Sequence, residues 1–309
     1  METIIAKNIS RLFHNERGVR DISLSVTSGT SFGVLGSNGS GKTTLTRLIT
    51  GLDKIQKGTL SVFGVSAYGR PSNLRLRCGI SLDKTAHWES LTGRQNLYFF
   101  ARQYGLSGSM LTQRIETLLE EAEILEQANE PVSAYSLGMR RKLSIIEAIV
   151  HEPDLLIMDE PSAGVDVAFL DKLAYWIKKR NTERKTTWIS DNDPDWIARA
   201  ATDVILLENG KIKASGIVPE LMNSVKALNR INITIENGEI GEKPNIKGIE
   251  QFQYEGNHII ADVLDDPNLT TELLSWINRT GLRIQSMQVK SLTLHEALIK
   301  QSKLKELKS

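Results

Sequence analysis

A glycine-rich segment that ends in Lys-Thr carries the strongest chemical signal in this sequence. Residues 36–43 read Gly-Ser-Asn-Gly-Ser-Gly-Lys-Thr and fit the pattern G-x-x-x-x-G-K-[ST] at every specified position. Glycines let backbone N–H groups turn inward around phosphate oxygens, because no Cβ stands in the way. Lys42 is expected to reach the β- and γ-phosphates of a nucleotide, and the Thr43 hydroxyl to bind Mg²⁺. The expected nucleotide-binding residues of this loop are Gly36, Ser37, Asn38, Gly39, Ser40, Gly41, Lys42, Thr43 and Thr44.

Two carboxylates follow an apolar run further along the chain. Leu155–Met158 predicts a buried strand, and Asp159 and Glu160 come directly after it. In an open α/β sheet the nucleotide lies at the carboxyl ends of the strands. Asp159 is therefore expected to orient Mg²⁺ through its water shell, and Glu160 to polarise the attacking water as a general base.

The elements that must position these residues are also readable. Ser31–Leu35 predicts a strand before the glycine-rich loop, and Thr44–Ile49 predicts the start of a helix after it. These flanks favour a phosphate-binding loop over a glycine-rich turn that binds nothing. Short apolar runs at 186–190 and 204–207 add further strands, and helical spacing of apolar residues predicts a helix over 111–125. Residues 1–222 are thus predicted to form an α/β domain with a parallel sheet.

A second, smaller domain is predicted over residues 226–309. Ile231, Ile233 and Ile235 alternate with polar residues, as in a strand with one solvated face. Thr293 and Glu296 predict a capping box at the start of the last helix. The expected α+β domain has further strands over 249–254, 258–263 and 282–289 and helices over 270–278 and 294–307.

Composition narrows the classes of protein. The 309 residues carry a net charge of +1, which does not favour nucleic acid as the main partner. The single cysteine, Cys78, suits a reducing cytosol and is expected in the core. No apolar run of about 18 residues predicts a membrane-spanning helix. The five histidines, namely His14, His87, His151, His258 and His295, show no metal-ligand spacing and are expected to be ordinary surface or packing residues.

Residues 135–143, Tyr-Ser-Leu-Gly-Met-Arg-Arg-Lys-Leu, resemble the signature of ABC transporter ATPases, and the likeness continues over about residues 1–220. Ser136 is expected to cap the following helix, whose N-terminus and Gly138 amide would face a γ-phosphate held by a partner subunit. Leu137 and Met139 replace the common Gly and Gln, and this version is similar to that of the drug and antibiotic exporters. The resemblance implies a P-loop ABC ATPase core with a helical subdomain.

Four more positions take roles from this resemblance. Phe13 matches the aromatic residue that stacks on adenine, with a buried core position as the alternative reading. Asp166 matches the acidic residue of a loop that crosses between subunits. Asp83 stands where the family has a Gln that meets the helical subdomain and the metal. Asn192 stands where the family has a histidine that contacts the γ-phosphate, and because Asn carries no positive charge, slow turnover is expected.

The resemblance also implies partners. ATP and Mg²⁺ would be shared with a second ATP-binding subunit, in a homodimer or a heterodimer, and a separate membrane permease would be driven from the cytoplasmic face. Segment 87–101, which begins at His87 and Trp88, resembles the part that receives a short helix of the permease in exporters; aromatic packing inside the helical subdomain is the alternative for Tyr98, Phe99 and Phe100. Two other functions stay open: a soluble nucleotide-dependent regulator with little turnover, and a non-transport ABC protein of translation or DNA maintenance.

Overall fold

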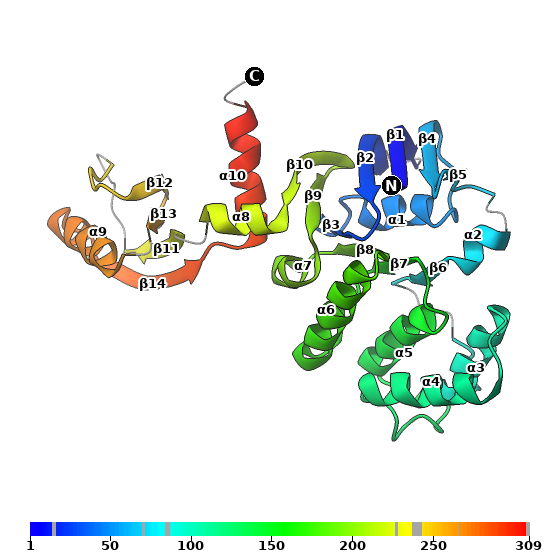
Figure 1. Cartoon of the computed structure of the whole chain (residues 1–309). Coiled ribbons are helices and arrows are strands. Elements are labelled where there is room, and N and C mark those ends of the chain that lie inside the picture. The colour runs from blue at the N-terminus through cyan, green and yellow to red at the C-terminus, as the bar shows by residue number, and fades with distance from the viewer. Residues whose placement is uncertain are drawn as a thin grey trace. The chain divides into compact units, whose positions relative to one another are not determined.

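The computed structural model describes residues 1–13, 17–69, 72–83, 87–225, 228–236, 243–264 and 266–306 (Figure 1). The chain divides into two compact units, Met1–Val218 and Pro219–Ser309, and each is described by itself. His14 and the predicted last helical residue, Leu307, lie outside the described residues.

The first unit begins with an antiparallel sheet. Its strand order is β2-β1-β4-β5, built from β1 (Glu2–Leu12), β2 (Gly18–Thr27), β4 (Lys57–Val62) and β5 (Val65–Ser66). The predicted parallel sheet does not include these strands. The segment 13–17 that joins β1 to β2 is too short for the crossover that a parallel pair needs.

The second sheet of this unit is the predicted parallel one. Its order is β10-β9-β3-β8-β7-β6, and only β10 runs antiparallel to its neighbour. Strands β3, β7 and β8 are buried along their whole lengths, as their apolar runs predicted. The bounds are β3 (Ser31–Leu35), β6 (Cys78–Ser81), β7 (Leu155–Asp159), β8 (Thr186–Asp191), β9 (Asp203–Glu208) and β10 (Lys211–Ile217).

Seven α-helices and one short 3-10 helix (Val132–Ala134) are described in the first unit. Among them, α3, α4 and α5 form the helical subdomain that the resemblance implied (Figure 1). The predicted helix over 111–125 ends earlier, because Glu123 has a φ of 58°, in the left-handed region that terminates helices. The bounds are α1 (Lys42–Ile49), α2 (Ser72–Leu76), α3 (Gly93–Gln103), α4 (Gly108–Glu121), α5 (Leu137–Ile149), α6 (Val167–Thr182) and α7 (Pro194–Ala200).

The second unit is a four-stranded antiparallel sheet with helices, the predicted α+β arrangement. Ile231, Ile233 and Ile235 bury one face of β11 against apolar residues of α9. The last strand starts at Ile284 rather than at the predicted Leu282. The Glu296 carboxylate accepts a hydrogen bond from the Thr293 N–H at 2.7 Å, one half of the predicted capping box. The bounds are α8 (Val218–Val225), β11 (Leu228–Ile235), β12 (Ile249–Glu255), β13 (His258–Leu264), α9 (Pro267–Arg279), β14 (Ile284–Ser291) and α10 (Leu294–Glu306).

Candidate functional site

The glycine-rich loop lies between the carboxyl end of β3 and the first turn of α1. A Cβ on Gly36 would stand 2.4 Å from the Leu207 carbonyl oxygen, and one on Gly41 would stand 2.7 Å from the Gly18 carbonyl oxygen. Gly41 also has a φ of 109°, which side chains rarely allow. Glycine is therefore required at both positions, and the loop leads directly to a helix N-terminus, which favours anions.

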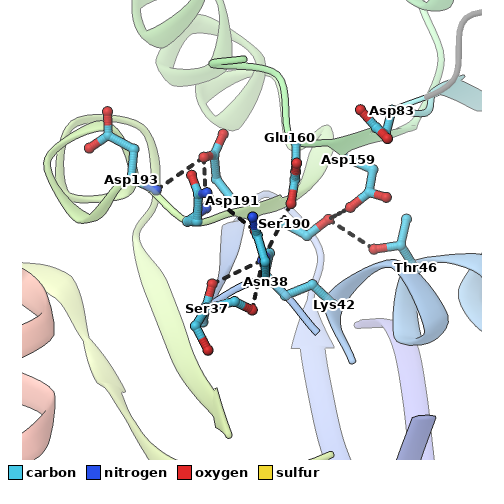
Figure 2. Close-up of polar contacts among 12 residues, drawn as sticks. Ser37, Asn38, Lys42, Thr46, Asp83, Asp159, Glu160, Ser190, Asp191 and Asp193 are labelled. Atoms are coloured by element: carbon cyan, nitrogen blue, oxygen red, sulfur yellow. Dashed lines mark hydrogen bonds and ion pairs between the residues drawn. The ribbon is translucent and has the colours of Figure 1, made fainter. Parts of the chain in front are cut away.

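Lys42 is placed over this loop. Only 3% of its side chain is exposed, and its ammonium donates to the carbonyl oxygens of Gly36 and Ser37 at 2.9 and 3.3 Å. The ammonium also lies 3.4 Å from a carboxylate oxygen of Glu160. Figure 2 shows Glu160 and Lys42 on facing elements, with Asp159 and Ser190 beside them. The structure thus brings together the predicted phosphate-binding lysine and the predicted general base.

Asp159 ends β7 and is fully buried. The Ser190 hydroxyl donates to Oδ1 of this carboxylate at 2.5 Å, Thr43 lies close to it, and its Oδ2 is buried without a protein partner among the described residues. Burial raises the pKa of Asp159, and the bonds from Ser190 and Thr43 offset part of that shift. Carboxylate and hydroxyl oxygens are ligands that Mg²⁺ prefers. A buried carboxylate with one oxygen unpartnered therefore fits the cation expected here.

Glu160 occupies an unusual backbone position directly after Asp159. Its φ is 50°, in the left-handed region, where a non-glycine residue costs on the order of 1–3 kcal/mol. Its N–H donates to the Ser190 carbonyl oxygen at 2.7 Å, which holds the turn against β8. No group of three or more His, Cys, Asp and Glu that could hold a metal occurs in the described part of the chain.

Sequence reasoning did not assign a role to Asp191, which organises the neighbouring loops. Its buried carboxylate accepts from the Ser162 hydroxyl at 2.8 Å and from the N–H groups of Asn192 and Asp193 at 2.7 and 3.1 Å. Burial raises the pKa of Asp191, and these bonds offset part of the shift. The exposed side chain of Asn192 donates to the Asn38 amide oxygen at 3.4 Å, so Asn192 lies beside the phosphate loop.

The signature residues form a second cluster around α5. The Ser136 hydroxyl accepts from the Met139 N–H at 3.2 Å, which confirms the predicted cap. A Cβ on Gly138 would stand 2.5 Å from the Gly164 carbonyl oxygen, so the helix start touches the loop that follows Glu160. Leu137, beside Gly138, is 67% exposed.

Asp166 also belongs to this second cluster. Its carboxylate caps α6 by accepting from the Phe169 N–H at 2.9 Å and pairs with the Lys142 ammonium at 2.7 Å. The hydrogen bond from Lys142 is the main reason that the pKa of Asp166 is lowered.

The two remaining predicted positions are surface residues. Phe13 is 43% exposed, so the buried core reading is wrong, and the Arg11 guanidinium carbon lies 5.1 Å from the ring centre. The Asp83 carboxylate accepts from Nη2 of Arg141 at 3.0 Å. Arg141 was not predicted as a site residue. Its positive charge within the signature, residues 135–143, could have suggested such a role.

Comparisons with known proteins identify the family of this chain. The sequence profile of the family described as "ABC transporter" matches residues 19–163. The ABC transporter ATP-binding protein NatA of Bacillus subtilis is 30% identical over 229 residues, which cover 72% of this chain and 93% of NatA. The daunorubicin resistance ATP-binding protein DrrA2 of Streptomyces coeruleorubidus is 25% identical, over 96% of this chain and 93% of DrrA2.

Solved structures agree on the fold. The structure of an ATP-binding subunit of an ABC transporter superposes with a TM-score of 0.66 at 25% identity, over 72% of this chain and 92% of that chain. A dimeric ATP-binding cassette bound to ADP and phosphate superposes with a TM-score of 0.63 at 20% identity, over 70% of this chain and 98% of that one. The described residues include no helix long and apolar enough to span a bilayer. On these grounds the chain belongs to the ABC transporter ATP-binding proteins and is an ATPase of that family.

Proposed function

We propose that this ATPase is the ATP-driven subunit of an exporter-type ABC transporter and that it acts on a separate membrane permease from the cytoplasmic face. Its relatives include proteins named for export or resistance, such as the linearmycin resistance ATP-binding protein LnrL of Bacillus subtilis, 29% identical over 74% of both chains. The observation that carries the proposal is the convergence of Lys42, Asp159 and Glu160 at one edge of the parallel sheet.

Each of these residues has a role in the proposed hydrolysis. Lys42 binds and orients the β- and γ-phosphates, and Glu160 holds the attacking water and accepts its proton. Asp159 and Thr43 would hold Mg²⁺, which supplies charge compensation for the phosphates when bound. Phe13, exposed at the end of β1, offers a face for the adenine ring.

The proposed reaction uses two subunits. Ser136 and Gly138, together with the N-terminus of α5, present hydrogen-bond donors to the γ-phosphate bound by the partner subunit. Asp166 follows Gly164 in the loop that touches Gly138 and pairs with Lys142 of α5. Binding of the shared ATP closes the dimer, and loss of the γ-phosphate reopens it.

A permease surface is proposed at α3. A shallow groove of about 430 Å³ is lined by Leu91, Gln95, Tyr98, Phe99, Arg102 and Gln103, and we call it the aromatic groove. Trp88 is 54% exposed and lies edge-on to Phe99, with ring centres 5.8 Å apart. Exposed Trp and Arg side chains around a hollow are typical of residues that dominate binding energy at interfaces.

A tagged pull-down from detergent-solubilised membranes with ATP present tests the function. Recovery of a polytopic membrane protein supports the transporter, and the number of ATP-binding chains recovered distinguishes a homodimer from a heterodimer. The variant Trp88→Ala should lose the membrane protein, whereas an exposed change outside the groove, Tyr175→Ala, should retain it. Recovery of the wild type without a membrane protein would favour the regulator with little turnover, the alternative that Asn192 raises.

A further inference from the structure

A segment over residues 82–89 precedes the aromatic groove in the sequence. Helix α5 contacts it at one end, at residues 82–83, and at the other end, at residues 87–89. At the first end, the Arg141 guanidinium donates to the carbonyl oxygens of Leu82 and Asp83 at 2.8 and 3.0 Å. The same group lies 3.3 Å from the carbonyl oxygen of Asp159. Arg141 is buried, so its bonds are shielded from water and join α5 to both the segment and the end of β7.

At the second end, His87 joins the segment to α5 through both ring nitrogens. Its side chain is 3% exposed, with Nδ1 3.2 Å from a carboxylate oxygen of Glu147 and Nε2 3.0 Å from the carbonyl oxygen of Arg140. A carbonyl oxygen only accepts, so Nε2 must donate, and a second proton lies between Nδ1 and Glu147. Burial lowers the pKa of His87, but the hydrogen bond and charge of Glu147 outweigh it and raise the pKa overall.

Glu89, two residues later, is held by the same turn of α5. The Arg140 guanidinium donates to the Glu89 carboxylate at 2.9 Å and to the carbonyl oxygens of Ser133 and Tyr135 at 3.0 and 3.1 Å. Arg140 thus ties Glu89 to the residues that lead into the signature serine.

Trp88 lies between these two attachments and has a fixed backbone. Its N–H donates to the Asn96 side-chain oxygen at 2.9 Å, and its carbonyl accepts from the Asn96 amide at 3.1 Å. Asn96 is fully buried in α3. The indole is therefore exposed on a backbone that α5 holds through His87 and Glu89.

We propose that His87 is a positioning residue that couples the aromatic groove to the signature helix, so that a shift of α5 at the nucleotide moves Trp88, and a shift of Trp88 moves α5. The inference rests on the proposed function, because it takes the start of α5 as ATP-facing. The coupling is direct: Glu147 and Arg140 are both on α5, and the peptide of His87 continues into Trp88. An apolar side chain at position 87 could not make these two polar contacts with α5.

Hydrogen exchange of the full chain, with and without a slowly hydrolysed ATP analogue and Mg²⁺, tests this coupling. In the wild type, nucleotide should change amide exchange both in α5 and over residues 88–100. In His87→Leu the response over 88–100 should be lost while that of α5 remains. Glu147→Gln removes the charge with little change of shape and should lose the same response even if the leucine variant folds poorly. His258→Leu, in the second unit, is the matched control and should respond as the wild type does.

The outcomes separate the two proposals. If α5 responds but residues 88–100 respond equally in wild type and both variants, the coupling through His87 is wrong while the proposed function stands. If residues 88–100 of the wild type do not respond, the coupling is also wrong. If α5 itself does not respond to nucleotide, the ATP-facing role of its N-terminus is wrong, and the coupling falls with it.

Discussion

The Lys42 ammonium and the Glu160 carboxylate lie 3.4 Å apart, and they join the end of the phosphate loop to the residue that follows β7. In the proposed reaction, this one cation would contact both the phosphates and the residue that positions water. A bound phosphate would compete with Glu160 for this ammonium, because both are anions that need the same donors. The carboxylate would then be released towards water at the moment a nucleotide arrives.

Replacement of Lys42 tests its role in binding. Lys42→Met should weaken ATP binding at least about tenfold, about 1.4 kcal/mol, because the methionine supplies no charge to the phosphates. Isothermal titration with ATP and Mg²⁺ measures this. Lys57→Met, at the exposed start of β4, is the matched control and should keep wild-type affinity. Equal affinities for the two variants would contradict the assignment.

Replacement of Glu160 separates binding from hydrolysis. Glu160→Gln should lower kcat by roughly 10²–10⁴-fold, the usual contribution of a general base, with ATP affinity retained. Phosphate release in steady state and ATP binding at equilibrium are the two measurements. A variant that hydrolyses ATP like the wild type would show that another group takes the proton from water.

Residue 192 offers a gain-of-function test. Asn192→His should raise turnover by about tenfold, since an imidazole near the phosphate loop can carry the charge that Asn lacks. Turnover should be measured from pH 6 to 9, and the gain should fall as the imidazole loses its proton. Asn209→His, in the turn after β9, is the control. If turnover is unchanged, Asn192 does not limit the rate.

The Ser136 cap at the start of α5 is expected to contribute to the free energy of unfolding. Ser136→Ala should lower the free energy of unfolding by about 1 kcal/mol, because the Met139 N–H loses its acceptor. Urea unfolding measures this, and Ser136→Asp, which restores an acceptor, should recover most of the loss. A variant as stable as the wild type would mean that water replaces the cap without cost.

The buried pair of His87 and Glu147 predicts a pH dependence. The pKa of His87 is raised in the folded chain, so its stabilising contribution is fully present below about pH 6.5, the unfolded value, and is lost as pH rises through the folded pKa. The charged groups that act on it are Glu147 and Arg140, both of α5. The stability difference between wild type and Glu147→Gln should therefore shrink from pH 6 to pH 9. A constant difference would contradict the shared proton.

The parts of this site that could be predicted are those formed by residues close together in the sequence. The phosphate loop, the strand ending in Asp159 and the Ser136 cap depend on residues a few positions apart, and each pattern has one geometry. The partners of Arg141 and His87 could not be predicted, because they lie 58 and 60 residues away and depend on how α5 packs. The same holds for Asp191, whose contacts reach back to Ser162.

The ends of some helices and strands also could not be predicted from local sequence. The early end of α4 depends on the left-handed backbone of Glu123, which apolar spacing does not encode. The antiparallel pairing of β1 and β2 follows from the shortness of their connection rather than from residue types. The two-residue delay of β14 leaves Leu282 and Arg283 outside the ladder, and no sequence signal marks that start.

The contact between Gly138 and Gly164 has a consequence for how the two nucleotide sites are linked. A Cβ at residue 138 would stand only 2.5 Å from the Gly164 carbonyl oxygen, so the signature and the loop after Glu160 are in close backbone contact. In the proposed dimer, the first of these would serve the neighbour's nucleotide and the second would serve the chain's own. A displacement at one nucleotide site would then be passed on to the other site through this backbone contact.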